Sequence, residues 1–477
     1  MLRRASCRTS PFRLGSRPII TLLHLGMAQD RNGAAKTSRG IASAIERALF
    51  LLGLLVIVFV GGIAVGRYDL PPAPVLNAAV DAARDWLENW RNYFGLRSKW
   101  RVSNHRGAGV TRHDPERAYR GYTFLTMYRD GLVRPYLIDM EGRIRHRWPL
   151  DLPAIWKAAG YDRDPMPVSD FSIHGAQLVE NGDVVLNLSA AALVRLDRCG
   201  RVVWAARFGA HHDVERIPGG GWVAPGRRVI DKAPDPDLWY LRPDANGQFK
   251  VDTIVLVDDD GNIVDERPLI ELFKNSDLHA LLVRNGSSSL ANSAFDPLHF
   301  NDIEPVTPDI ADAFPSFDAG DWLLSLRNLN AVVVVDAGFS RIKWWRIGPF
   351  LRQHDPQLLP NGHILVFDNR LTGRKPRLGY SRIIELDPVS WDIVWSYTGT
   401  DEDPFYSHIG GKLQLLPNGN ILAVEPQGGR VFELTHDTRP EIVWEYVNDL
   451  GDGDAGYIFD AQRVPSAALT FLDRPCP

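Results

Sequence analysis

The sequence predicts an all-β fold, a six-bladed β-propeller, with an N-terminal transmembrane helix and a short helical stalk in front of it. Two repeated units and a turn-rich composition, with 41 Gly and 33 Pro among 477 residues, support this fold. The hydrophobic content of 45% and the charged content of 23% are those of an ordinary folded core. The net charge of −4 gives no indication of a nucleic-acid partner.

The first repeated unit is a hairpin, in which an apolar strand, an acidic turn and a second strand follow one another. ALVRLDRCGRVVW and RIIELDPVSWDIVW are two clear copies, and both end in Trp. The six copies occupy residues 134–148, 192–204, 254–266, 332–345, 382–395 and 430–444. Short strands that recur with turn residues between them are typical of propeller blades.

The second repeated unit supplies two more strands, joined by a Pro/Asn-Gly turn. Its copies occupy residues 174–188, 212–226, 354–368 and 412–425, and a further copy opens at 299–304 and ends at 321–327. The first hairpin lacks such a partner. Residues 461–465 (AQRVP) resemble the opening strand PQLLP, so we expect the C-terminal strand to complete the first blade and close the ring. An eight-bladed ring is the alternative, but two further units would be needed.

The N-terminal region contains an uncharged run of 19 residues, 48–66, which is long enough to cross a bilayer. It shows no polar stripe, unlike a core helix, and is longer than the apolar part of most cleaved signals. Nine basic residues precede it and only Arg67 closely follows, which places the N-terminus in the cytoplasm and the rest in the periplasm of a Gram-negative cell. We therefore expect a single-pass inner-membrane protein.

This organisation gives four expected regions. Residues 1–47 form a basic cytoplasmic leader, 48–66 the membrane helix, 67–120 a stalk with a helix at 77–93, and 121–477 the propeller. Either Met1 or Met27 could start the chain. Cysteine occurs only at Cys7, Cys199 and Cys476, without the spacing of a metal site. Cys199 and Cys476 share one compartment, where they could pair or remain free thiols.

Four histidines fall at one position of the repeat, three residues before a polar residue of the opening strand: His174, His212, His299 and His354. The opening strand of a blade is innermost, so these side chains are expected to meet at one mouth of the central channel. A single histidine of this kind is most simply a turn or capping residue, but four of the chain's 13 at one position favour a site. His211 and His408 lie nearby and out of phase.

Convergent imidazoles serve either as metal ligands or in nucleophilic and acid–base catalysis. Arg327 ends the next strand in the blade of His299, and Asn301 follows His299 by two residues, on the same strand face. An Arg and an Asn beside imidazoles favour a sulfate or phosphate group over a metal ion. We therefore expect an anion site with no metal.

Three segments resemble the bacterial aryl-sulfate sulfotransferases: QHDPQLLPNGHILVFDN (353–369), HFNDIEP (299–305) and AHHDVERIPGGG (210–221). The resemblance covers about residues 120–470, and the membrane anchor is a departure from the best-known members. It implies a six-bladed propeller that moves a sulfuryl group from a phenolic sulfate ester to another phenol. It implies neither a nucleotide sulfate donor nor a cofactor, and its small-molecule partners are the phenolic donor and acceptor.

The resemblance also implies roles for the site residues. His354 matches the nucleophile, which carries the sulfuryl group as a sulfohistidine and gives ping-pong kinetics. His299 and Asn301 match the supporting pair, and Arg327 matches the arginine that binds the sulfuryl oxygens. His212 fits the repeat better than His211, although the resemblance does not settle the choice. His299 or His212 would exchange the proton of the phenol.

Trp322, Phe300 and Tyr406 are candidates to stack on the aryl groups, or else simply pack in the core. Two other functions stay open at this point. A membrane-anchored propeller could scaffold an envelope assembly without catalysis, because the fold alone decides no function. A quinone-cofactor dehydrogenase is the third reading. It is disfavoured by the count of six units and by the lack of a vicinal Cys pair or a calcium loop.

Overall fold

The computed structural model describes residues 34–67, 98–104, 106–167, 171–232, 241, 243, 247–274, 276–286, 296–370, 380–474 and 476. The chain divides into two compact units, Met1–Tyr93 and Phe94–Pro477. Cys7 and the helix expected at residues 77–93 lie outside the described residues.

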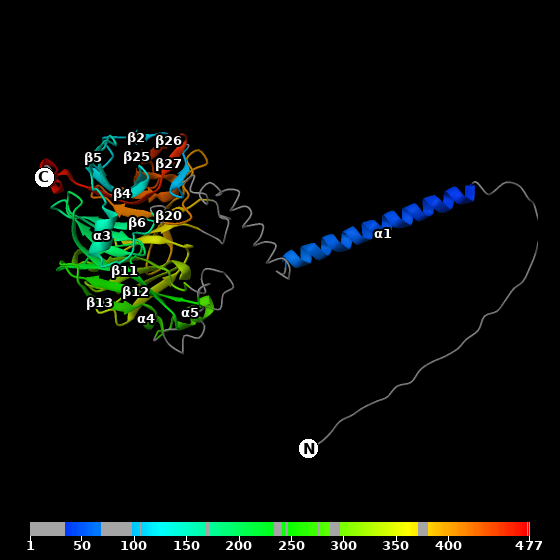
Figure 1. Cartoon of the computed structure of the whole chain (residues 1–477), viewed down its shortest axis with the longest axis horizontal. Coiled ribbons are helices and arrows are strands. Elements are labelled where there is room, and N and C mark those ends of the chain that lie inside the picture. Colours follow the sequence, from blue (N-terminus) through cyan, green and yellow to red (C-terminus); the bar gives the residue numbers. More distant parts are fainter. Residues whose placement is uncertain are drawn as a thin grey trace, which may run out of the picture. The chain divides into compact units, whose positions relative to one another are not determined.

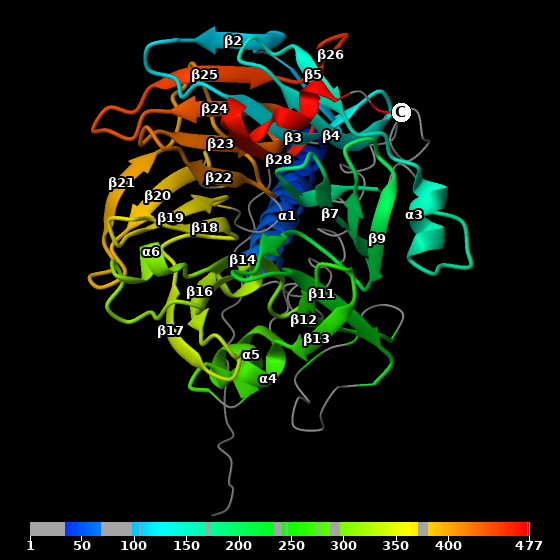
Figure 2. The same cartoon turned by 90° about the vertical axis from the view of Figure 1, so that its left-hand side faces the viewer.

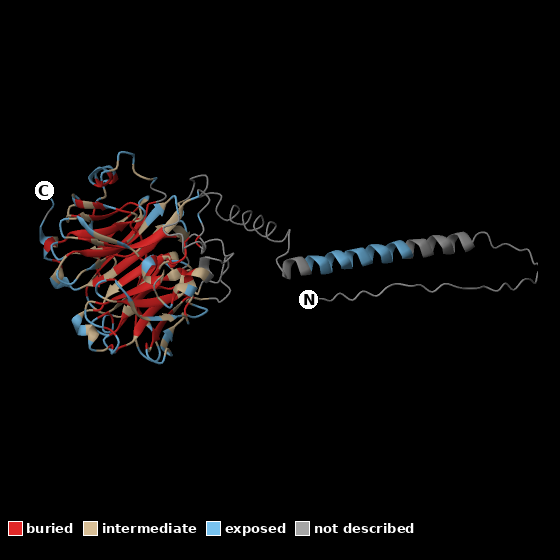
Figure 3. Cartoon of the chain, turned by 90° about the horizontal axis from the view of Figure 1, so that it is seen from below, coloured by how far each residue is buried: buried red, intermediate tan, exposed pale blue. Residues whose placement is uncertain are grey.

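The first unit contains one long helix, α1 (Ala34–Arg67), drawn in blue in Figure 1. Its stretch Glu46–Ile63 has a mean hydropathy of 2.2, and none of it is buried within the protein. Figure 3 colours the middle of this helix as exposed. By length and composition, α1 could therefore cross a membrane once.

The second unit is mostly β. Figure 2 shows its sheets following one another around a common centre. Within the described residues there are six antiparallel sheets of four or five strands, and each contains one of the predicted hairpins. The first three sheets comprise β28 (Ile458–Val464), β3 (Tyr122–Arg129), β4 (Leu132–Ile138) and β5 (Ile144–Arg147); β6 (Ile173–Leu178), β7 (Val184–Leu188), β8 (Ala192–Leu196) and β9 (Val202–Arg207); and β10 (Glu215–Arg216), β11 (Trp222–Ile230), β12 (Phe249–Val257) and β13 (Ile263–Pro268).

The other three sheets comprise β14 (Phe300–Pro305), β15 (Trp322–Leu326), β16 (Ala331–Val335) and β17 (Ile342–Ile347); β18 (His354–Leu358), β19 (Ile364–Asp368), β20 (Arg382–Leu386) and β21 (Ile393–Tyr397); and β22 (Lys412–Leu415), β23 (Ile421–Glu425), β24 (Arg430–Leu434), β25 (Ile442–Val447) and β2 (Gly109–His113). A small sheet joins β1 (Arg101–Ser103), β27 (Asp454–Gly456) and β26 (Asp449–Gly451).

Both ends of the second unit pair with distant strands. Residues 461–464 of the predicted segment 461–465 lie in β28, which pairs with β3. Near the start, β1 pairs with β27 and β2 pairs with β25. The sheets therefore begin at Arg101, whereas the expected stalk extended to residue 120. The stalk prediction missed β1 and β2 because neither belongs to a repeated unit.

Helices of the second unit are short and connect or cover the sheets: α3 (Leu152–Ala158), α4 (Ile270–Lys274), α5 (His279–Gly286), α6 (Pro308–Ala311), and the 3-10 turns η2 (Arg327–Leu329), η3 (Pro426–Gly428), η4 (Ser466–Ala468) and η5 (Thr470–Asp473). Cys199, in the turn between β8 and β9, forms a disulfide with Cys476 near the C-terminus. This bond answers the question that the sequence left open.

The core lies between neighbouring sheets, and the described residues form six apolar clusters there. In one cluster, Leu125 and Met127 of β3 pack with Leu422 and Val424 of β23, which joins the first sheet to the last. The two middle strands of each sheet are mostly buried, as the red strands of Figure 3 show, whereas outer strands such as β5, β13, β17 and β21 are largely exposed or half-buried. Each buried Leu or Val contributes roughly 1.5–3 kcal/mol, so the sheet-to-sheet contacts dominate the stability of this unit.

The inner strands of four sheets are irregular at the same level. The pairing register shifts between Ile173 and Gly175, between Phe300 and Asp302, between His354 and Gln357, and between Ile458 and Asp460. A β-bulge leaves a residue unpaired and redirects its side chain, and bulges are common beside active sites. These four irregularities position the candidate site.

Candidate active site

A cavity of about 290 Å³ lies where the inner strands converge. It is lined by all the histidines predicted to be in phase, by both predicted polar partners, and by an aromatic wall and a charged floor: Trp100, His174, His212, His299, Asn301, Asp302, Arg327, His354, Asp355, Ile409, Gly410, Gly411, Lys412, Pro426, Tyr457 and Phe459. Neither His211 nor His408 lines this cavity. His212 is therefore the residue of the His-His pair that faces the site.

The floor of the cavity corrects the predicted phase of one histidine. Lys412 Nζ lies 2.7 Å from Asp213 Oδ1, 3.3 Å from Asp302 Oδ1 and 2.7 Å from Asp355 Oδ1. Asp213 and Asp355 directly follow His212 and His354, whereas Asp302 follows Asn301. The residue in phase with His212 and His354 is thus Asn301, and His299 enters the cavity from two positions earlier.

Local backbone geometry turns these side chains inward. His212 has a φ of 62° and His299 a φ of 52°, both in the left-handed region that residues other than glycine rarely adopt. Gly175 follows His174 at a bulge, and a Cβ there would collide with the backbone carbonyl of His212. Glycine therefore permits the close approach of two inner strands, and it brings the His174 and His212 rings within 5.1 Å.

His354 is held in one orientation by an amide. Its Nδ1 lies 2.7 Å from Asn369 Oδ1, and the Asn369 amide donates to the carbonyls of Ser407 and Gly410, both at 2.7 Å. Because the amide is committed to these carbonyls, its oxygen must accept, so Nδ1 of His354 carries the hydrogen. The lone pair then lies on Nε2, which accepts a hydrogen bond from the Gly410 N–H at 3.3 Å. Burial lowers the pKa of His354 well below its ordinary value, and Arg327 lowers it further, so the imidazole is neutral.

A pair of imidazoles, those of His212 and His299, lies beside His354. His212 Nε2 and His299 Nε2 are 3.1 Å apart, and the ring centroids of His212 and His354 are 5.8 Å apart. His299 Nδ1 donates to Asp296 Oδ2 at 2.5 Å. Burial lowers the pKa of His299 to about 4, against the opposing effect of Asp296. In the absence of an added charge, these two rings are neutral at pH 7.

Arg327 supplies the positive charge of the cavity. It begins η2, directly after β15, and the described residues include no carboxylate within ion-pair distance of its guanidinium. Its Nε is buried without a hydrogen-bond partner. Burial lowers the pKa of Arg327 to about 10, and Arg352 acts in the same direction, yet the group remains charged at neutral pH. A buried cation without an anion is costly, which favours binding of an anionic group at this point.

The aromatic wall was not predicted. The Trp100 ring lies 5.4 Å from Tyr457 and 4.9 Å from Phe459, and His174 stacks on Phe459 at 5.1 Å. Of the aromatic candidates, Trp322 and Phe300 are packed in the core between two sheets. Tyr406 is half-buried and does not line the cavity.

Part of this wall could have been found by alignment. Gln462 of β28 corresponds to Gln357 of β18, which places Phe459 at the position of His354. The same alignment of Gln414 places Lys412 at the position of Asp355. Trp100 and Asp296 belong to no repeated unit, so no comparison of repeats would reveal them.

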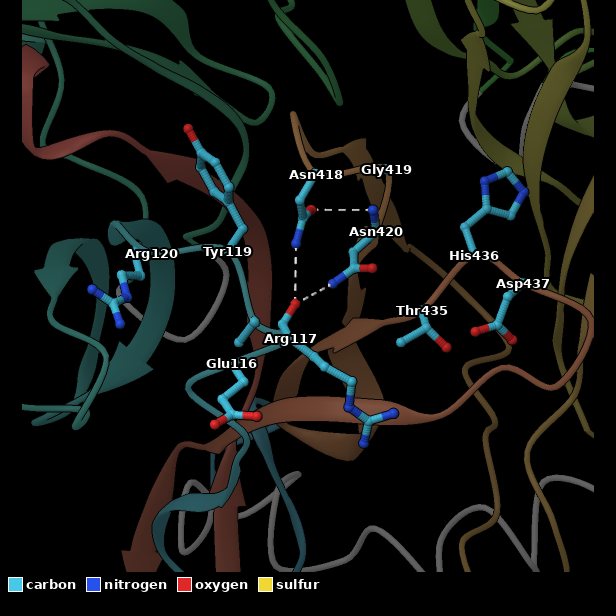
Figure 4. A pocket seen from close by; sticks show the side chains of 11 residues that line it. Glu116, Arg117, Tyr119, Arg120, Asn418, Gly419, Asn420, Thr435, His436 and Asp437 are labelled. Atoms are coloured by element: carbon cyan, nitrogen blue, oxygen red, sulfur yellow. Dashed lines mark hydrogen bonds between the residues drawn. The ribbon is translucent and has the colours of Figure 1, made fainter.

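A second cavity, of about 600 Å³, lies between the segment before β3 and the turns of β22–β23 and β24–β25. Figure 4 shows Asn418 and Asn420 pointing at the backbone carbonyl of Arg117, to which both side chains donate, at 3.1 and 2.9 Å. His436 bonds to Glu385 at 2.6 Å. These polar groups have hydrogen-bond partners within the protein. The bonds from Asn418 and Asn420 to Arg117 hold the segment before β3 in place, so we assign this cavity a structural role. Among the described residues, no group of His, Cys, Asp and Glu could hold a metal ion.

Comparison with known proteins adds a family. The family described as arylsulfotransferase (ASST) matches residues 175–449. Similar solved structures include a protein of unknown function from Bacteroides caccae, with 15% identity, coverage of 71% of this chain and 98% of that one, and a TM-score of 0.40. The virginiamycin B lyase of Staphylococcus aureus is similar with 11% identity, coverage of 74% of this chain and 88% of that one, and a TM-score of 0.37. The WD40 β-propeller domain of Doa1 is also similar, with 11% identity, coverage of 78% of this chain and 99% of that one, and a TM-score of 0.38. No curated protein matches the sequence.

Proposed function

The chain belongs to the arylsulfotransferase family, and on this premise we propose that it moves a sulfuryl group from an aryl sulfate to a phenolic acceptor through a sulfohistidine at His354. The observation that carries this proposal is that one cavity holds both the neutral, oriented imidazole of His354 and the guanidinium of Arg327, which has no carboxylate partner among the described residues. Asn369 fixes the tautomer that places the lone pair on Nε2 of His354. Arg327 lines the same cavity, and no carboxylate of the described residues lies within ion-pair distance of it.

The first half-reaction uses the lone pair of His354. Nε2 gives up its hydrogen bond from the Gly410 N–H and attacks sulfur. The bond between sulfur and the aryl oxygen breaks, and the leaving phenolate takes a proton from the His212–His299 pair. Nδ1 of His354 keeps its hydrogen bond to Asn369 while the ring carries the sulfuryl group. A neutral imidazole is required for this attack, and burial keeps His354 neutral.

Arg327 is placed to bind the sulfuryl oxygens while charge moves from the ester to the leaving oxygen. Its fork of N–H donors suits the three equatorial oxygens of the reacting group. The Asn301 amide donates to the carbonyl of Gln353 at 2.9 Å, and its Oδ1 is buried without a partner. In the second half-reaction, an acceptor phenol returns its proton to the imidazole pair, its oxygen attacks sulfur, and His354 is released. Two separate half-reactions give ping-pong kinetics.

We propose that the six sheets are the blades of a closed propeller. Three features support this arrangement: the sheets follow one another in chain order, an apolar cluster lies between each neighbouring pair, and β28 pairs with β3. Closure removes free sheet edges and brings the six inner strands to one cavity.

We also propose that α1 anchors the enzyme in the inner membrane, with the second unit in the periplasm. The excess of basic residues before the apolar stretch supports this orientation. The Cys199–Cys476 disulfide suits an oxidising compartment.

The test uses the full chain in detergent, with 4-nitrophenyl sulfate as donor and phenol as acceptor. We expect nitrophenol release that depends on phenol, and without phenol a burst of about one nitrophenol per enzyme. His354→Ala should abolish both. His363→Ala is the matched control, because His363 is half-exposed, bonds to Glu385 and lies outside the cavity. Absence of acceptor-dependent release in the wild type would overturn the proposal.

A further inference from the structure

A chain of three side chains leads from the cavity into the protein. His212 lines the cavity and contacts His299 through Nε2 at 3.1 Å, and His299 contacts Asp296 through Nδ1 at 2.5 Å. Asp296 is buried, and its other oxygen pairs with Arg227 at 3.0 Å. The Asn328 amide donates to the backbone carbonyl of Asp296 at 2.5 Å. Since Asn328 follows Arg327, the carboxylate and the anion-binding arginine are tied to one turn.

Hydrogen-bond logic fixes the protons of this chain. A carboxylate paired with arginine only accepts, so Nδ1 of His299 carries a hydrogen. In the neutral pair, Nε2 of His299 therefore holds a lone pair and accepts the Nε2–H of His212. Because that contact occupies Nε2 of His212, Nδ1 is the nitrogen of His212 that can exchange a proton with a ligand in the cavity. One proton added to the pair at this nitrogen can be passed on, so that the positive charge moves to His299, next to Asp296.

We propose that Asp296, His299 and His212 form a proton relay that takes up one proton when an aryl sulfate binds and delivers it to the leaving phenolate. Asp296 is a positioning residue, because it acts through His299. This inference rests on the proposed sulfuryl transfer and adds the source of the proton that the transfer requires.

The relay balances over one turnover. The bound ester carries one negative charge and the protonated pair one positive charge. Nδ1–H of His212 passes to the phenolate, while the Nε2–H of His299 passes to Nε2 of His212. Both rings are then neutral, in the tautomers of the empty site. The acceptor phenol restores the proton in the second half-reaction, and it leaves to solvent with the anionic product.

The charges around the pair favour uptake only when an anion is present. Arg327 and Arg227 lower the pKa of His299, and Asp296 raises it. A sulfate ester on Arg327 offsets that arginine and adds a negative charge, which raises the affinity of the pair for a proton. The charged and titratable groups facing the pair are Arg227, Asp252, Asp296, Arg327, His174, His211 and His354.

Leaving-group dependence tests the relay. 4-Nitrophenolate leaves without much help from an acid, whereas phenolate requires a proton. Asp296→Asn should therefore lower kcat/KM for phenyl sulfate about 10–100-fold more than for 4-nitrophenyl sulfate. Asp183→Asn is the matched control, since Asp183 is likewise buried and pairs with an arginine, Arg195, but does not line the cavity. It should lower both rates by the same factor. Equal losses for both substrates in Asp296→Asn would overturn the relay.

Proton uptake gives a readout that needs no turnover. Phenylmethanesulfonate resembles the ester but has no transferable sulfuryl group, and its binding can be followed by calorimetry in buffers of different ionisation enthalpy. The wild type should take up about one proton near pH 7, and Asp296→Asn clearly less. His212→Gln, which keeps the pair of Asp296 with Arg227, should show the same loss if Asp296→Asn folds poorly. Binding without uptake in the wild type would overturn the relay, even where transfer itself is observed.

Discussion

Single residues of the cavity combine strained backbone with assigned hydrogen bonds. His212 and His299 both adopt left-handed backbone, which costs of order 1–3 kcal/mol each and persists only where the surroundings impose it. This backbone conformation allows His299 to contact Asp296 and His212 to contact His299. Orientation of the cavity imidazoles is therefore built into the fold itself.

Asn369 provides the clearest test at this scale. Asn369→Ala removes the acceptor for Nδ1–H of His354, so the ring can adopt the tautomer in which Nε2 is protonated, and kcat should fall about 100-fold or more. Asn369→Asp also removes the amide donor to Ser407 and Gly410, but it keeps an acceptor for His354. Stability should therefore drop in both variants, while kcat drops most in Asn369→Ala. Steady-state kinetics and thermal unfolding separate the two effects, and equal kcat values would contradict the tautomer assignment.

The repeats allowed most of the cavity to be predicted, but only where a residue belongs to a repeat. His174, His212, His354, Asn301 and Arg327 all line the cavity as expected. His299 also lines it, although Asn301, not His299, occupies the position of His212 and His354. A bulge near Asn301 also breaks the period of two that placed Asn301 on the face of His299. Asp296 and Trp100 come from connecting segments, and their role depends on contacts across the chain that no local pattern encodes.

At the scale of strands, irregular pairing is concentrated at the inner strands β6, β14, β18 and β28. His174, Asn301 and Phe459 are skipped in these ladders and all line the cavity. A regular strand would point every second residue at a neighbouring sheet. The bulges instead turn side chains of these strands into the cavity, which explains how well-packed sheets can present polar groups at their centre.

The last strand should be essential for folding. A chain that ends at Tyr457 lacks β28, exposes the edge of β3 and removes Ile458 and Ala461 from the core, so we expect aggregated protein without a cooperative thermal transition. A chain that ends at Arg474 keeps β28 and, among the described residues, loses only Cys476 with its disulfide to Cys199. It should fold with a stability lower by about 2–4 kcal/mol. A monomeric, cooperatively folding chain without β28 would contradict the proposed closure, as judged by size-exclusion chromatography and calorimetry.

At the scale of the whole molecule, the centre concentrates buried charge. Lys412 pairs with Asp213, Asp302 and Asp355, and Asp460 lies nearby on β28. Burial raises the pKa of Asp460 to about 7, although Lys412 opposes this shift. The histidines above this floor behave in the opposite sense, since burial lowers the pKa of His174 and His299 to about 4. The inner strands thus place two sets of groups with opposite pH responses next to each other.

These opposite shifts predict how acid affects stability. The unfolded chain protonates His174 and His299 near pH 6.5, but the folded chain does so only near pH 4, so their contribution is complete above pH 6.5 and is lost as the pH falls towards 4. Asp460 acts in reverse, because its raised pKa stabilises the folded state at low pH. Burial also lowers the pKa of His212 and His354 and raises that of Asp302 and Glu304, so the expected quantity is the effect of one group. Between pH 7.5 and pH 5, the free energy of unfolding of Asp460→Asn should fall by about 2 kcal/mol more than that of the wild type. Urea unfolding at both pH values measures this difference. Asp460→Asn lacks a group that opposes the histidines, so its loss at pH 5 should be the larger one, and a loss equal to or smaller than that of the wild type would contradict the raised pKa of Asp460.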